Sequence, residues 1–114
     1  MRTNFQMEYQ NITMIKGDTV MFNVVIFDDV GNAVEVDEAY FTCKKNPETS
    51  NTLFQKRLNS GIIQEDKLMV VRIAPDDTKN ADVGNYYYDL QLVIGDDVFT
   101  ALIGTFTIEQ DVTN

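Results

Sequence analysis

Carboxylates in turn-like segments are the side chains of this sequence best suited to chemistry. They fall into three groups: Asp28, Asp29, Asp37 and Glu38; Asp76, Asp77 and Asp82; and Asp96 and Asp97. Oxygen-rich loops can bind Ca²⁺, but the run from Asp28 to Asn32 departs from the EF-hand order, because Val30 is its third residue and Gly31 comes too early. Asp is also a common turn residue. We therefore expect these groups to shape turns, and we expect no metal and no other cofactor.

Other residues offer little for catalysis. The chain has no histidine, so it lacks an imidazole that could act as a base near neutral pH or as a metal ligand. Its single cysteine, Cys43, can form no internal disulfide, and its alternating strand neighbours Phe41 and Lys45 supply only one cation near a thiolate. Nothing in the sequence specifies the cleft between two acids that glycoside hydrolysis needs. We expect a buried Cys43, no catalytic residues and no enzymatic activity.

Length and charge limit the classes of partner. The chain has 114 residues, with 9 Lys and Arg against 18 Asp and Glu, a formal net charge of −9. One domain over residues 1–114 is the natural organisation for this length. Excess carboxylates oppose binding to nucleic acid and to anionic membranes. Residues 1–10 lack the apolar centre of a signal peptide, and the lone cysteine fits a reducing cytoplasm, so we expect no signal-dependent secretion.

Alternation with period two predicts strands throughout the chain. The expected strands span residues 7–15, 19–28, 39–45, 52–58, 67–74, 85–94 and 98–109, with a further short strand at 60–64. In the second strand, Val20, Phe22, Val24 and Ile26 form the expected core face, and Met21, Asn23, Val25 and Phe27 the other. In the sixth, Tyr86, Tyr88, Leu90 and Leu92 are expected to face inward. Short strands separated by turn residues predict a β-sandwich or barrel.

The segment before the sixth strand resembles the tyrosine corner of immunoglobulin-like domains. Asp82, Gly84 and Tyr86 match its Asp-x-Ala/Gly-x-Tyr pattern, in which the tyrosine hydroxyl bonds to backbone upstream. Tyr88 stands where those domains carry a disulfide cysteine. The expected role of this corner is structural. It favours an all-β fold, an Ig-like β-sandwich of seven to eight mostly antiparallel strands without a disulfide.

The register of the last hairpin decides which of its residues face outward. The favoured pairs are Tyr86 with Phe106, Tyr88 with Gly104, and Leu90 with Leu102. They follow from a three-residue loop at 95–97, which also turns Val98 inward. A two-residue turn that starts at Gly95 suits type II′ geometry but would turn Phe106 outward.

The favoured register leaves an apolar outer face on this hairpin. Its residues are Tyr87, Val93, Phe99, Ala101 and Ile103. Contiguous exposed apolar surface often marks an interface. These five residues are therefore the candidate contacts with another protein or with a second copy of the chain. In the alternative, the N-terminal segment with Phe5, Met7 and Tyr9 covers this face.

Three stretches resemble the Ig-like N-terminal domain of phage baseplate upper proteins and related tail, fibre and prophage domains. They are Ile15-Lys16-Gly17-Asp18-Thr19, Val71 to Thr78, and Gly84 to Leu92 continuing through Thr100, Gly104, Phe106 and Asp111-Val112-Thr113. The resemblance covers residues 12–113. It implies a non-enzymatic virion component, made in the bacterial host cytoplasm and assembled through protein contacts, with a homo-oligomer as one arrangement. The alternative is an accessory carbohydrate-binding Ig-like domain of a bacterial surface protein, with the saccharide at Tyr87 or at loop aromatics such as Tyr40 and Phe54.

Overall fold

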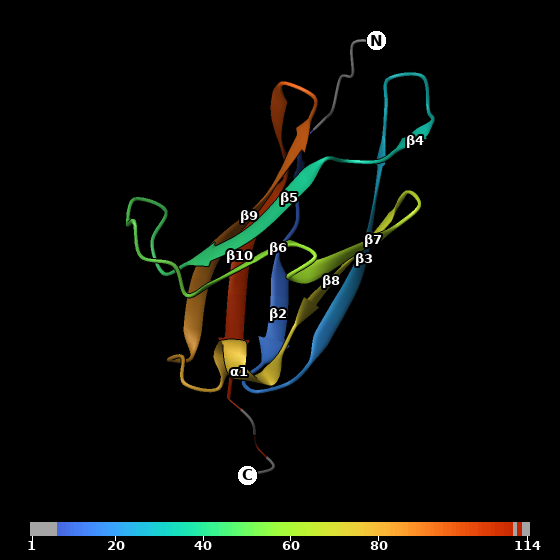
Figure 1. The fold of residues 1–114 in the computed structure, drawn as a ribbon. Helices are drawn as coiled ribbons and strands as arrows, with labels where there is room; N and C mark the ends of the chain where they lie inside the picture. Colours follow the sequence, from blue (N-terminus) through green and yellow to red (C-terminus); the bar gives the residue numbers. More distant parts are fainter. Residues whose placement is uncertain (1–6, 111, 113–114) are drawn as a thin grey trace.

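The computed structural model describes residues 7–110 and 112 and confirms the predicted all-β fold (Figure 1). The strands are β1 Glu8–Tyr9, β2 Ile12–Ile15, β3 Val20–Phe27, β4 Ala33–Val34, β5 Glu38–Lys44, β6 Phe54–Leu58, β7 Gly61–Glu65, β8 Leu68–Ile73, β9 Gly84–Ile94 and β10 Asp97–Glu109. A short helix, α1 (Pro75–Thr78), connects β8 to β9. The expected short strand at 60–64 is present as β7. The expected first strand is instead divided into β1 and β2, and β4 and α1 were not predicted.

The strands form one curled, mostly antiparallel sheet in the order β1-β10-β9-β5-β6-β7-β8-β3-β4, with β2 also paired to β10. A parallel contact of β6 with β7, Arg57 opposite Gly61 and Leu58 opposite Ile62, joins the two halves of the sheet. The halves face each other across a shared core, where the Phe22 ring of β3 lies 5.6 Å from the Phe41 ring of β5. The strands thus belong to one continuous sheet, and the Ig-like sandwich arrangement is not confirmed.

Aromatic rings fill the centre of this core. The Phe41 ring lies 5.0 Å from that of Tyr88 and 6.1 Å from that of Phe54, and Phe106 meets Phe54 edge-on at 5.6 Å. These rings face the core because side chains on one face of a strand recur at every second residue. The predicted inward face of the sixth strand is confirmed, since all four of its residues are buried. Cys43 is also fully buried, as expected.

A β-bulge sets the register of the β9–β10 hairpin. Ile94 pairs with Asp97, so the turn has two residues, Gly95 and Asp96, and the expected three-residue loop is wrong. The φ of +60° at Gly95 suits the first position of a type II′ turn. A register shift between Thr100 and Leu102 then adds one residue to β10. That residue restores the predicted pairs, Tyr86 with Phe106, Tyr88 with Gly104 and Leu90 with Leu102.

The N-terminal segment runs along the outer edge of β10. Both β1 and β2 pair with β10 in parallel, and Gln10 and Asn11 bridge the gap between them. The Tyr88 hydroxyl donates to the Gln10 carbonyl oxygen at 2.6 Å, and the Thr105 N–H donates to Asn11 Oδ1 at 3.1 Å. A Cβ on Gly104 would lie 2.8 Å from the Gln10 carbonyl carbon and closer still to its oxygen. Gly104 therefore makes room for this segment.

Candidate interaction surfaces

The predicted contact face on the β9–β10 hairpin is only partly exposed. Tyr87 faces outward with 43% of its surface exposed, and Val93 and Ile103 are half-buried on the same side. Val98 joins them, because it pairs with Val93, although it was expected to face inward. These four residues are the outer apolar side chains of the hairpin.

Two of the predicted contact residues face the core instead. Ala101 lies in the bulge and is only 7% exposed. Phe99 pairs with the fully buried Leu92, and directly opposed residues share one face of a sheet. The cause is the two-residue turn, which reverses the faces of β10 between the turn and the bulge. Among the described N-terminal residues, Met7 and Tyr9 do not cover this face, because both are exposed and β1 pairs with the edge of β10; Phe5 lies outside the described residues.

A more exposed apolar surface lies on the opposite half of the sheet. We call it the β3–β8–β7 face, and its members are Met21, Val25, Phe27, Ile63 and Leu68. Met21, Phe27 and Ile63 are 62%, 55% and 60% exposed. Val25 pairs directly with Leu68, and Ile63 pairs with Val70, which makes the patch continuous across three strands.

Polar residues border this face, and Asn23 lies within it, between Met21 and Val25 and opposite Val70. Arg72 lies opposite Met21, and Glu65 lies opposite Leu68. An apolar patch with a polar border is typical of protein interaction sites. The signal was visible in the sequence, because residues 20–27 are apolar on both faces, but a strand with two apolar faces does not show which face is covered.

A small hollow lies beside Tyr87 on the outer face of β5, β9 and β10. It has a volume of about 140 Å³, and its lining residues include Thr42, Lys44, Asp89 and Ile103. Burial raises the pKa of the Asp89 carboxyl, an effect that the charge of Lys44 opposes. The hollow thus presents an aromatic ring beside two opposite charges. The other expected saccharide contacts are not in loops: Phe54 is buried in the core, and Tyr40 lies on β5 with the Arg57 guanidinium 5.6 Å from its ring centre.

The predicted corner residues lie together at the start of β9. The Tyr86 hydroxyl donates a 2.8 Å hydrogen bond to the Asp82 carbonyl oxygen, and Gly84 between them has a φ of +138°. Burial is the main cause that raises the pKa of the Tyr86 hydroxyl above its usual value. The Lys45 ammonium lies 4.7 Å from the centre of the Tyr86 ring. This arrangement fixes the connection from α1 to β9.

Several acidic side chains accept hydrogen bonds from backbone N–H groups in turns. Asp28 accepts hydrogen bonds from the N–H groups of Val30 and Asn32, and Asp37 accepts one from the N–H of Gly95. Among the described residues, no three His, Cys, Asp or Glu side chains are grouped closely enough to hold a metal ion. In the same part of the chain, no helix is long and apolar enough to cross a membrane.

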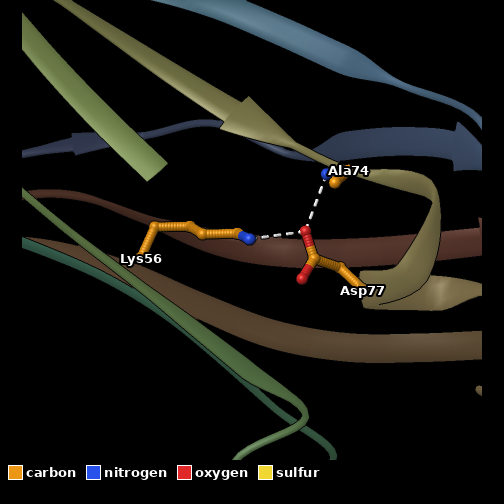
Figure 2. A network of polar contacts seen from close by, with 3 residues as sticks. All are labelled: Lys56, Ala74 and Asp77. Atoms are coloured by element: carbon orange, nitrogen blue, oxygen red, sulfur yellow. Dashed lines mark hydrogen bonds and ion pairs between the residues drawn. The ribbon is translucent and has the colours of Figure 1, made fainter. Parts of the chain in front are cut away.

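Asp77 contacts both Lys56 and the backbone of Ala74 at the end of the core beside α1 (Figure 2). Its Oδ2 atom lies 2.6 Å from the Lys56 ammonium of β6 and accepts the Ala74 N–H at 2.7 Å, just before α1. The two charged side chains are 15% and 16% exposed. The ion pair therefore connects β6 to α1, and its role is structural.

Comparisons with known proteins give no family assignment. No protein-family model and no curated protein matches the chain. Among solved structures, the chain is similar to a family 123 glycoside hydrolase from Clostridium perfringens, described in a study of glycolipid glycan hydrolysis. The TM-score is 0.49 and the sequence identity is 12%, over 93% of this chain and 23% of that one. The chain thus spans less than a quarter of that protein's length, and this likeness supports no functional inference.

Proposed function

We propose that this chain is a non-enzymatic structural module of a phage or prophage virion, in a tail, baseplate or fibre, which docks onto another virion protein through the β3–β8–β7 face. The observation that supports the proposal is the exposure of five large apolar side chains on that face. They leave on the order of 500 Å² of apolar surface in water, near the upper end for a monomer. A matching partner would bring the buried total to about 1,000 Å², at the small end of specific interfaces.

The chemistry of the remaining residues supports a non-enzymatic role. The chain has no histidine, and burial raises the pKa of the Cys43 thiol to about 12, so no thiolate is available at neutral pH. The carboxylates of Asp28 and Asp37 are bonded to turn N–H groups, and that of Asp77 is paired with Lys56. Groups that already hold the fold together are poor candidates for acid or base work.

The virion assignment draws on the resemblance to the Ig-like N-terminal domain of phage baseplate upper proteins. That resemblance implies synthesis in the bacterial host cytoplasm, followed by incorporation into particles. A net charge of −9 is consistent with a partner that is protein, because it opposes both nucleic acid and anionic lipid.

Particle association tests this proposal. Particles released from lysogenic cells that encode the chain would be purified on a density gradient and probed for it. We expect the chain in the particle fractions, with Ile63→Asp lost from them and Tyr87→Asp, on the hairpin face, retained. Both variants replace exposed residues, and thermal melting would confirm that they fold. A chain found only in the free-protein fractions would contradict the proposal.

The hollow beside Tyr87 favours a second candidate function, saccharide binding. An aromatic ring next to the Asp89 carboxylate and the Lys44 ammonium offers both stacking and hydrogen bonding to a sugar. A glycan array with and without Ca²⁺ tests this candidate, with Tyr87→Ala as the control variant. Binding that Tyr87→Ala abolishes would support it, and an array without signal would remove it.

A further inference from the structure

One edge of β3 lacks a partner strand along most of its length. Residues 20–25 of β3 pair with β8 on one side. On the other side β4 pairs only with Ile26 and Phe27, and within residues 7–110 no further strand is paired there. Backbone N–H and C=O groups of a strand point alternately to its two sides, so part of residues 20–25 offers free hydrogen-bonding groups at this edge.

A groove runs along this open edge, and we call it the edge groove. Two hollows of about 350 and 340 Å³ lie between β3 and the N-terminal strands, and they share Gln10, Asn23, Val24 and Leu102 in their linings. The lining of the second hollow comes from β2 and the residues before it on one side and from β3 on the other; both strands are blue in Figure 1. Phe22, Tyr88 and Leu102 contribute apolar surface to it. The edge groove therefore combines an unpaired backbone edge with an apolar lining.

We propose that the edge groove binds an extended segment of a partner protein, which adds to β3 as a further strand. Main-chain hydrogen bonds to residues 20–25 would hold the segment, and alternate side chains would enter the groove, as in other complexes formed by strand addition. Six residues of β3 span about 20 Å, so the segment needs about six residues. This inference rests on the proposed protein-binding function and specifies how the partner is held.

Charge indicates the chemistry of that segment. Among the described residues that line the edge groove, Glu8 alone carries a charge, which is negative, and the whole chain has a formal net charge of −9. An extended segment with apolar residues at alternate positions and Lys or Arg at its ends fits both the lining and the charge. A second copy of the chain fits less well, because it carries the same negative charge. Val25 and Phe27 line the groove and also belong to the β3–β8–β7 face, so one partner can cover both.

A peptide library tests the inference directly. The probes are synthetic octapeptides with Val, Ile, Leu or Phe at alternate positions, Thr between them and Lys at both ends. We expect the best members to bind the full chain with dissociation constants below about 100 µM, and to protect amides of residues 20–25 from hydrogen exchange. Methylation of the peptide's backbone nitrogens removes its donors but keeps its side chains, and should weaken binding at least tenfold.

Two protein variants separate the edge groove from the β3–β8–β7 face. Gln10→Lys places a long cation in the groove and should weaken the Lys-flanked peptides at least tenfold, whereas the matched Ile63→Lys on the outer face should change binding less than twofold. The inference is overturned if no library member binds with a dissociation constant below about 100 µM, if N-methylated peptides bind equally well, or if a dimer of the chain occupies the edge. It would fail alone, with the proposed function intact, if Gln10→Lys still enters particles and Ile63→Asp does not.

Discussion

Replacing Gly104 by alanine should destabilise the protein by dislodging its N-terminal segment. The new Cβ would lie 2.8 Å from the carbonyl carbon of Gln10, whereas ordinary contacts begin near 3.4 Å. The clash involves backbone, so no side chain can swing away to relieve it. The segment must instead move off β10.

The hydrogen bonds lost in that movement give the expected size of the destabilisation. It would break the bond from the Tyr88 hydroxyl to Gln10, the 3.0 Å bond from the Gln10 N–H to the Ile103 carbonyl oxygen, and the bond from the Thr105 N–H to Asn11. At about 1 kcal/mol for each net hydrogen bond, the free energy of unfolding should fall by about 3 kcal/mol. For a domain of this size that corresponds to a fall in Tm of about 10 °C.

Urea unfolding followed by circular dichroism would measure the loss, and amide hydrogen exchange would locate it at Thr105. Tyr88→Phe serves as the control, because it removes only one of the three bonds and should cost about 1 kcal/mol. If Gly104→Ala unfolds within about 0.5 kcal/mol of the parent and the Thr105 amide stays protected, the N-terminal segment does not lie against Gly104.

Three further predictions concern the corner, the core thiol and the buried ion pair. Tyr86→Phe removes the hydroxyl that donates to Asp82, so urea unfolding should show a loss of about 1 kcal/mol, and an unchanged midpoint would argue against the corner bond. The Cys43 pKa is raised by burial from 9.0 to about 12, so the folded state keeps a proton that the unfolded state releases. Stability should therefore fall as pH rises from 9 towards 12, and Cys43→Ala should reduce that slope in urea midpoints; equal slopes would contradict the buried thiol. Lys56→Met leaves Asp77 without its cation in a mostly buried site and should cost about 2–4 kcal/mol, with a loss below 0.5 kcal/mol as the contrary result.

The alternation of apolar and polar residues along the strands made much of the fold predictable. In β9 and most of β3 one face is consistently apolar, so strand, face and approximate ends follow from the sequence. The hairpin pairs were also predictable, because Phe106 and Tyr86 must both be buried. The turn that produces those pairs could not be predicted, because a three-residue loop and a two-residue turn with a bulge give the same register beyond Leu102. The two routes differ only near the turn, which is where Phe99 and Ala101 were assigned to the wrong face.

Longer-range features depend on packing that local sequence does not specify. In the parallel contact of β6 with β7, the chain makes one tight loop and continues in the same direction, and Asn59 and Gly61 in this loop have positive φ angles of +69° and +101°. The β3–β8–β7 face was not identified as a candidate site, because apolar residues on both sides of a strand are equally compatible with a covered face. The open edge of β3 follows from which strands pair, and pairing is a property of the whole sheet.

Site-specific photo-crosslinking tests the central claim most directly, namely that the chain docks onto another virion protein through the β3–β8–β7 face. The photoreactive residue p-benzoylphenylalanine would replace Ile63 on that face or, as the matched control, Tyr87 on the hairpin, in cells that produce particles. We predict that Ile63→p-benzoylphenylalanine forms a crosslink to one particle protein and that the Tyr87 variant does not. Crosslinks from Tyr87 alone, or none from either position in assembled particles, would contradict the account.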